Sequence, residues 1–466
     1  MAGAYLAAMG IDLDAEMAKI QFGRDAAAAA SPATPAVARI MGVRLPSKPA
    51  SDLWDVLISD GRVASIEAHD PRAPRLSHLP GVLDASGCLL APSLCHAHIH
   101  LDKCFLLQDP KFADLQIEQG DFAEALTLTQ KAKARFEEDD LLRRGRQLIE
   151  ESIRYGVTAM RAFVEVDADV GFKCLDAGIK LKREFEARCH VQICAFAQLP
   201  LFSGPDGGET IRELMSEAVT REGVDVLGST PYVESKQEGT QRNVEWIASL
   251  ALKHDKFLDL HMDYHLDKTK EPFVWEAFKI LKEKRWVEDK GKMITLGHCT
   301  RLTHFDDGDW SKLREAIGDL PVSFVGLPTS DLFMMRTEED VRGSLNIPKL
   351  IQKHELHGAL AVNNVGNAFT PHGSCDPLAI ASLGIGLYQT GTKAGAELLY
   401  GCISGRAKAA IGLPSAKLEI AEGDPADFVL FDNKGPEWRS RRGLAEVVYD
   451  PPNLRKTVKN GHITTD

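Results

Sequence analysis

Four histidines carry the strongest chemical signal in the sequence. His98 and His100 form an H-x-H pair in CHAHIHLDK, His261 lies in LDLHMDYHLD and His298 lies in ITLGHCTRL. Residues two apart on a β-strand point to the same face, so His98 and His100 can offer two imidazole nitrogens to one metal ion. A single histidine of this kind is more often a hydrogen-bonded core residue. Because His261 and His298 each end another expected strand, the four together predict a metal centre.

Eight short apolar runs in the middle of the chain are expected to form buried strands. Between them lie stretches such as DDLLRRGRQLIEESIRYG, in which apolar residues recur every three or four positions, as in amphipathic helices. Eight strand-and-helix units predict an α/β protein with a (β/α)8 TIM barrel, whose reactive residues lie at the C-terminal ends of the strands. The expected strands are residues 89–95, 157–164, 191–197, 224–229, 257–261, 293–298, 322–327 and 358–363.

The two ends of the chain show a different pattern. Short alternating runs such as WDVLISDGRVASIEA and KLEIAEGDPADFVLFDN predict small antiparallel strands. We therefore expect residues 38–88 and 414–466 to form one small β-sandwich domain, and residues 89–413 to form the barrel. Residues 1–37, which include the stretch DAAAAASPATP, are expected to be an N-terminal arm to which we assign no chemistry.

Composition and charge exclude several classes of protein. The 466 residues include 55 Lys and Arg against 67 Asp and Glu, a net charge of −12. This acidic balance argues against nucleic acid or an anionic membrane surface as a partner, and no apolar run is long enough to predict a membrane-spanning helix. Nine scattered cysteines without a C-x-x-C pair, and no basic leader, favour a cytoplasmic location. The expected partner is a small-molecule substrate, and the sequence leaves open whether the protein forms a homo-oligomer.

The combined pattern resembles the amidohydrolase superfamily, in particular its cytosine-deaminase-like branch. The resemblance covers about residues 38–462 and is carried by the histidine positions and by the segments HIHLDK, AFAQLPLFS, GHCT and EGDPADFVLFD. It implies a metal-bearing barrel with a flanking β-sandwich. It also implies hydrolysis, through a metal-activated water, of a non-peptide carbon–nitrogen bond in a cyclic amide, an amidine or a deaminase-type molecule.

The resemblance also implies roles for individual residues. His98, His100 and His261 would be metal ligands, Gln198 would face the substrate, and His298 would hydrogen-bond the attacking water or the developing oxyanion. Members with two metals carry a carboxylated lysine after the fourth strand. This chain reads VLGSTPYVES there, which favours a single divalent ion, and zinc and iron both suit imidazole ligands.

Two positions depart from that branch. Asn363 and Asn364 stand after the eighth strand, where the branch has an aspartate, and Tyr264 stands in place of a glutamate. The Asn363 amide can offer its oxygen to a metal but cannot be a general base, and Asn364 is expected to bind substrate. The reference pKa of tyrosine, about 10, makes Tyr264 a poor proton shuttle. Asp331, after the seventh strand, is the expected replacement base, and a helix-capping role is the equal alternative.

Other polar residues leave further alternatives open. Asp102, Asp263 and His265 are further candidates for the missing acid and base, and Asp102 is also a candidate partner of a ligand histidine. Lys103 is a candidate for neutralising an acidic substrate, and the segment from about Phe105 to Phe136 is a candidate lid. Hydrolysis is the preferred interpretation. There are two alternatives. One is a metal-assisted lyase or isomerase with Tyr264 as proton donor, and the other is a non-catalytic binding barrel.

Overall fold

The computed structural model describes residues 35–72, 78–289, 291–414, 417–433 and 437–465. The chain divides into two units, Met1–Pro35 and Ala36–Asp466, and the fold described below is that of the second. The predicted N-terminal arm therefore lies, apart from its last three residues, outside the described part of the chain.

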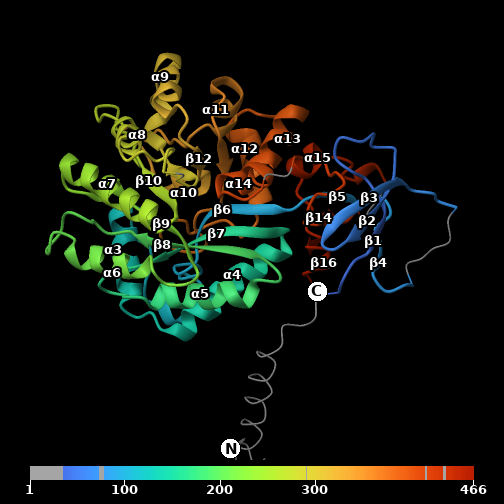
Figure 1. Ribbon diagram of the computed structural model, residues 1–466, viewed down its shortest axis with the longest axis horizontal. Helices are drawn as coiled ribbons and strands as arrows, with labels where there is room; N and C mark the ends of the chain where they lie inside the picture. Colours follow the sequence, from blue (N-terminus) through green and yellow to red (C-terminus); the bar gives the residue numbers. More distant parts are fainter. Residues whose placement is uncertain (1–34, 73–77, 290, 415–416, 434–436, 466) are drawn as a thin grey trace, which may run out of the picture. The chain divides into compact units, whose positions relative to one another are not determined.

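Eight parallel strands form the predicted barrel, and each pairs with its neighbours in the sequence (Figure 1). The first and last strands meet where the His100 N–H donates to the Asn363 carbonyl at 2.8 Å and the Asn363 N–H donates to the His98 carbonyl at 3.2 Å. The (β/α)8 fold class is thus confirmed. The strands are β6 (Leu94–His100), β7 (Val157–Glu165), β8 (His190–Ala197), β9 (Val224–Ser229), β10 (Phe257–Met262), β11 (Ile294–His298), β12 (Val322–Gly326) and β13 (Gly358–Leu360).

Amphipathic helices connect and cover these strands (Figure 1). In α4 (Glu138–Arg154), Leu141, Leu148 and Ile149 are buried, and a reciprocal capping box between Glu137 and Asp140 starts the helix. The other helices are α3 (Phe122–Lys133), α5 (Lys173–Phe185), α6 (Glu209–Ala218), α7 (Gln237–Lys253), α8 (Val274–Glu283), α9 (Asp307–Ile317), α10 (Pro328–Met334), α11 (Ile347–His354), α12 (Pro377–Leu387), α13 (Lys393–Cys402), α14 (Gly405–Ala410) and α15 (Leu444–Tyr449).

Two smaller sheets, built from both ends of the chain, form the predicted β-sandwich. One has the order β3-β2-β1-β4 and the other the order β16-β15-β14-β5. Their facing side chains share one apolar core, to which the first sheet contributes Ile40 and Val56 and the second contributes Leu90 and Phe428. The strands are β1 (Arg39–Val43), β2 (Trp54–Ser59), β3 (Arg62–Ala68), β4 (Val82–Asp84), β5 (Leu89–Pro92), β14 (Phe428–Phe431), β15 (Arg455–Lys459) and β16 (His462–Ile463).

The first predicted barrel strand, residues 89–95, is divided in the structure. Leu89–Pro92 pairs with β14 in the sandwich, whereas the first barrel strand starts at Leu94 and pairs with β7. Both halves are buried and apolar, so hydrophobicity alone does not separate them. The predicted domain boundaries at residues 38, 89 and 414 stay a prediction. Among the described residues, no helix is both long and apolar enough to cross a membrane.

Candidate active site

Three of the four predicted histidines bring ligand atoms together at one end of the barrel. His98 and His100 lie two residues apart on β6, and His261 lies on β10. One nitrogen from each ring falls within 4.8 Å of the others, and His100 Nε2 lies 3.4 Å from His261 Nε2. All three side chains are buried. The H-x-H spacing therefore places both β6 imidazoles toward His261, as the strand alternation predicts.

These three side chains fit a divalent cation. Both ring nitrogens of His98, and Nδ1 of His100 and of His261, are buried without a hydrogen-bond partner in the described part of the chain. Burying polar atoms in this way is costly unless a ligand satisfies them. Burial, followed by repulsion from neighbouring histidines and Lys103, lowers the pKa of each imidazole well below 6.5. Neutral imidazole nitrogens are suitable ligands for such an ion, and the 3.4 Å between His100 Nε2 and His261 Nε2 matches two nitrogens that share one ion at about 2.0–2.1 Å.

The backbone around the histidines is unusual. His298, at the end of β11, has φ +67°, and Asn363, just after β13, has φ +71°. Non-glycine residues seldom adopt this left-handed region, and such residues cluster at functional sites. Gly297 allows β11 to pass close to the triad, because a Cβ there would lie only 3.2 Å from His98 Cε1.

His298, the fourth histidine, has a carboxylate partner instead of a place in the triad. Its Nδ1 lies 2.7 Å from Oδ1 of Asp331 in α10, and the second carboxylate oxygen accepts a hydrogen bond from Ser344 at 2.8 Å. Burial raises the pKa of Asp331, and the bonds from His298 and Ser344 oppose that shift. Because Asp331 is fully buried, its carboxylate acts on the site through the His298 ring.

Tyr264 covers the face of His298. The two rings stack with centroids 3.7 Å apart. Burial, with smaller contributions from Asp331 and Tyr232, raises the pKa of Tyr264 well above 10.0. Tyr264 therefore stays protonated at neutral pH and can donate a hydrogen bond, but it cannot replace a carboxylate base.

The orientation of the Asn363 amide is set by a hydroxyl pair. Asn363 Nδ2 donates to Ser330 Oγ at 2.7 Å, and Ser330 Oγ lies 2.6 Å from Thr370 Oγ1. Asn363 Oδ1 is buried and has no partner in the described part of the chain. This arrangement leaves the amide oxygen as the atom available to a cation or a substrate.

A buried chain of ion pairs, called the charge ladder below, runs from Lys103 at the pocket through Glu165 and Lys133 to Asp167. Lys103 Nζ donates to Glu165 Oε1 at 2.7 Å and to Gln198 Oε1 at 3.3 Å. Lys133 Nζ donates to the other Glu165 oxygen at 2.6 Å and also bonds Asp167. Burial alone would raise the pKa of Glu165, but the two lysines hold it at about 2. The charge ladder fixes the Lys103 ammonium beside Gln198.

Aromatic side chains narrow the pocket between these groups. Its volume is about 20 Å³, which is room for about one water molecule. Phe122, the first residue of α3, packs edge-on against Tyr232, Tyr264 and Phe369, with centroids 5.7–6.4 Å apart. Phe122 lies within the segment predicted as a lid. The pocket is lined by His100, Lys103, Phe122, Gln198, Tyr232, His261, Tyr264, His298, Asn363, Asn364 and Phe369.

Some sequence candidates have other roles. Asp102 accepts a hydrogen bond from the Glu165 backbone at 2.7 Å and not from a ligand histidine. Asp263 accepts from the Phe273 and Val274 N–H groups, so it supports the start of α8. His265 does not line the pocket.

Sequence reasoning missed four residues that hold the site: Ser330, Ser344, Lys133 and Glu165. Ser330 directly precedes Asp331 in TSD, but no pattern in the sequence marks the other three.

Comparison with known proteins supports the fold. No family model matches the chain. The chain is 23% identical over 426 residues to N-isopropylammelide isopropyl amidohydrolase from Pseudomonas sp. strain ADP, covering 88% of this chain and 93% of that protein. The structure of 5-methylcytosine deaminase from Klebsiella pneumoniae matches with a TM-score of 0.77 at 22% identity, covering 91% of this chain and 96% of that one.

A zinc-bound structure is also similar. An adenosine deaminase from Xanthomonas campestris with bound zinc matches with a TM-score of 0.62 at 15% identity, covering 93% of each chain. Together these similarities show that the chain has the fold of these deaminases, as the motifs indicated.

Proposed function

We propose that this protein, which shares its fold with amidohydrolases and deaminases, is a metal-dependent hydrolase. Its substrate would be a small cyclic amide, amidine or aminated heterocycle, cleaved at a non-peptide carbon–nitrogen bond. The observation that carries the proposal is the buried cluster of His98, His100 and His261 beside the paired His298 and Asp331. Four of the six ring nitrogens in this cluster have no hydrogen-bond partner among the described residues.

The triad is the proposed ligand set. His98, His100 and His261 would hold one divalent ion, zinc or iron, and the Asn363 amide oxygen would complete the set as a neutral ligand. The ion supplies Lewis acidity, which polarises the substrate and makes water a stronger acid. Asn363 keeps the oxygen of the expected aspartate but not its basicity, so another group must accept the proton.

His298 is the proposed proton acceptor. With Nδ1 bonded to Asp331, the ring presents Nε2 toward the pocket, which it lines. The buried carboxylate holds this tautomer and stabilises the imidazolium that forms when Nε2 takes a proton. An Asp–His pair would thus supply the base that Asn363 has lost, and His298 could return the proton to the leaving nitrogen.

The remaining pocket residues are proposed to bind and orient the substrate. Gln198 and Asn364 line the pocket and offer amide groups, and the Lys103 ammonium is held beside Gln198. Tyr264 would donate a hydrogen bond or, as part of the aromatic wall, exclude water. Together with Phe122, these groups line a narrow aromatic slot. Because the slot has room for only about one water molecule in this structure, a planar ring carrying oxygen substituents would enter it only after Phe122 moves aside.

One observation favours a second candidate, a lyase or isomerase. Among the residues that line the pocket in the described part of the chain, none is a carboxylic acid. A lyase or isomerase reaction uses no water, so it needs no base to deprotonate an attacking water molecule. Protonated Tyr264 would be the acid of that reaction. Oxygen-18 from solvent water distinguishes the two, because a hydrolase incorporates it into the product and a lyase does not.

The proposal is tested by measuring metal content and turnover together. The purified protein, reconstituted with zinc or iron, would be assayed for ring opening of cyclic amides and for ammonia or amine release from aminopyrimidines and N-alkylated triazines. We expect about one metal per chain, turnover of at least one panel member, and loss of both in a His261→Ala variant. A protein that takes up metal but turns over no member of the panel would contradict the proposal.

A further inference from the structure

A second and larger pocket lies at the amino-terminal ends of the last three barrel strands. Met293 directly precedes β11, Ser323 lies near the start of β12, and His357 directly precedes β13. The volume is about 560 Å³, within the usual range of small-molecule sites. His298 and Asn363 lie at the opposite ends of these strands, so this pocket is separate from the candidate active site.

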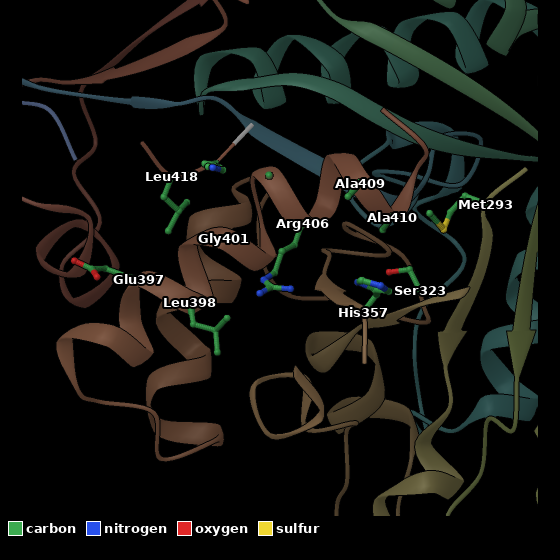
Figure 2. Close-up of a pocket in the computed structure, with 13 residues that line it drawn as sticks. Met293, Ser323, His357, Glu397, Leu398, Gly401, Arg406, Ala409, Ala410 and Leu418 are labelled. Carbon is green, nitrogen blue, oxygen red and sulfur yellow. The ribbon is translucent and has the colours of Figure 1, made fainter. Parts of the chain in front are cut away.

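Small and apolar residues create this space. Figure 2 shows the wall formed by α13 and α14, which contribute Leu398, Gly401, Ala409 and Ala410. A Cβ added at Gly401 would reach Cδ of Arg406 and both methyls of Leu418 only at 4.0 Å, so no atom of the protein fills that volume. The walls therefore offer an apolar surface to a ligand.

Arg406 is the arginine among the residues that line this pocket. Its side chain is partly buried and extends from α14 into the space between Leu398 and His357 (Figure 2). Throughout the described ranges, no hydrogen bond or ion pair is formed by its guanidinium. The five N–H donors of this group match a carboxylate, which can accept two of them side by side.

The other charges around the pocket favour an anion. Lys417 also lines it, and the exposed His357 carries no negative charge in either protonation state. The one carboxylate among the lining residues is Glu397, which points to the side of α13 away from Arg406 (Figure 2) and lies 4.0 Å from Lys393.

We propose that this pocket binds an amphipathic carboxylate. The carboxylate would pair with Arg406, and an aliphatic or aromatic body would lie along Leu398, Ala409 and Leu418. The binding requires neither the metal nor the chemistry of the other end of the barrel. It would give the protein a ligand site distinct from its substrate site.

Octanoate is the probe that tests this site. Isothermal titration calorimetry of octanoate into the full-length protein should give one site per chain. Because a hydrogen bond to a charged group contributes about 1.5–3 kcal/mol, Arg406→Met should weaken binding by roughly ten- to a hundredfold. Octan-1-ol, which lacks the carboxylate, should bind the wild type about as weakly as octanoate binds Arg406→Met. Arg314→Met, which removes an exposed arginine paired with Glu355, is the matched control and should leave the affinity unchanged.

A second variant guards against a folding defect. Ala409→Phe keeps Arg406 and fills the apolar part of the pocket, so it should also abolish binding, while thermal melting reports whether either variant is destabilised. Absence of binding to the wild type at millimolar octanoate would overturn the proposal. Octanoate binding that survives both Arg406→Met and Ala409→Phe would also overturn it. Binding that is lost in Lys103→Met and kept in Arg406→Met would do the same, because the probe would then occupy the candidate active site.

Discussion

Replacing Asp331 with asparagine isolates the contribution of the Asp–His pair. The amide has nearly the same shape as the carboxylate, so Asp331→Asn removes the charge at the 2.7 Å contact with His298 and leaves the packing. Without the carboxylate the imidazolium loses its counter-charge. Because an amide can donate as well as accept, the Nδ1-protonated tautomer is also no longer enforced. A positioned general base contributes about 10²- to 10⁴-fold to a rate, so kcat should fall by roughly that factor, or about 3–5 kcal/mol.

Steady-state kinetics of the metal-loaded enzyme would measure this loss. Because Asp331 does not line the pocket, KM and metal content should stay close to those of the wild type. The matched control is Asp376→Asn, another buried aspartate, which pairs with Arg455 and caps α12. It should lower the melting temperature and leave kcat unchanged.

A graded variant sharpens the result. Ser344→Ala removes the hydrogen bond to the second Asp331 oxygen but keeps its charge, so its effect on kcat should be much smaller than that of Asp331→Asn. A kcat for Asp331→Asn within about threefold of the wild type would refute the assignment of His298 and Asp331 as the proton-transferring pair.

Three further predictions concern the groups that hold the site. Ser330→Ala should free the Asn363 amide and weaken zinc binding about 10- to 100-fold, measured by competition with a chromophoric chelator; unchanged affinity would remove Asn363 from the ligand set. Glu165→Gln should cost roughly 3–5 kcal/mol in urea unfolding because it leaves Lys103 and Lys133 buried without their shared anion. The pKa of Glu165 is about 2 in the folded protein, below its ordinary 4.5, so its stabilisation is complete above about pH 4.5 and is lost as the pH falls toward 2; the variant should lack this dependence, and an identical pH profile in both proteins would contradict it. Phe122→Ala should widen the narrow pocket and speed metal removal by a chelator several-fold, whereas an unchanged rate would show that α3 does not control access.

The sequence by itself determined the architecture and the convergence of the three histidines. Apolar runs with helical stretches between them specify the eight strands, because hydrophobic periodicity is a local property of the chain. His98 and His100 alternate on one strand, and His261 lies at the end of another, so their convergence follows from the rule that parallel strands end at one rim of the barrel. The β-sandwich was likewise visible in the alternating patterns of the two chain ends.

Only the tertiary structure decided which groups contact and orient the side chains of this site. The sequence favoured Asp331 over Asp102 and Asp263 as the missing base but did not show what it contacts. The turn from β12 into α10 brings it to His298. Ser330 orients Asn363 across 33 residues, and Glu165 joins Lys103 and Lys133 from a third element. Such contacts depend on how distant segments pack, and no local pattern of residue types encodes them. For the same reason Arg406, one ordinary basic residue in the sequence, becomes a candidate ligand site only where α13 and α14 leave a pocket around it.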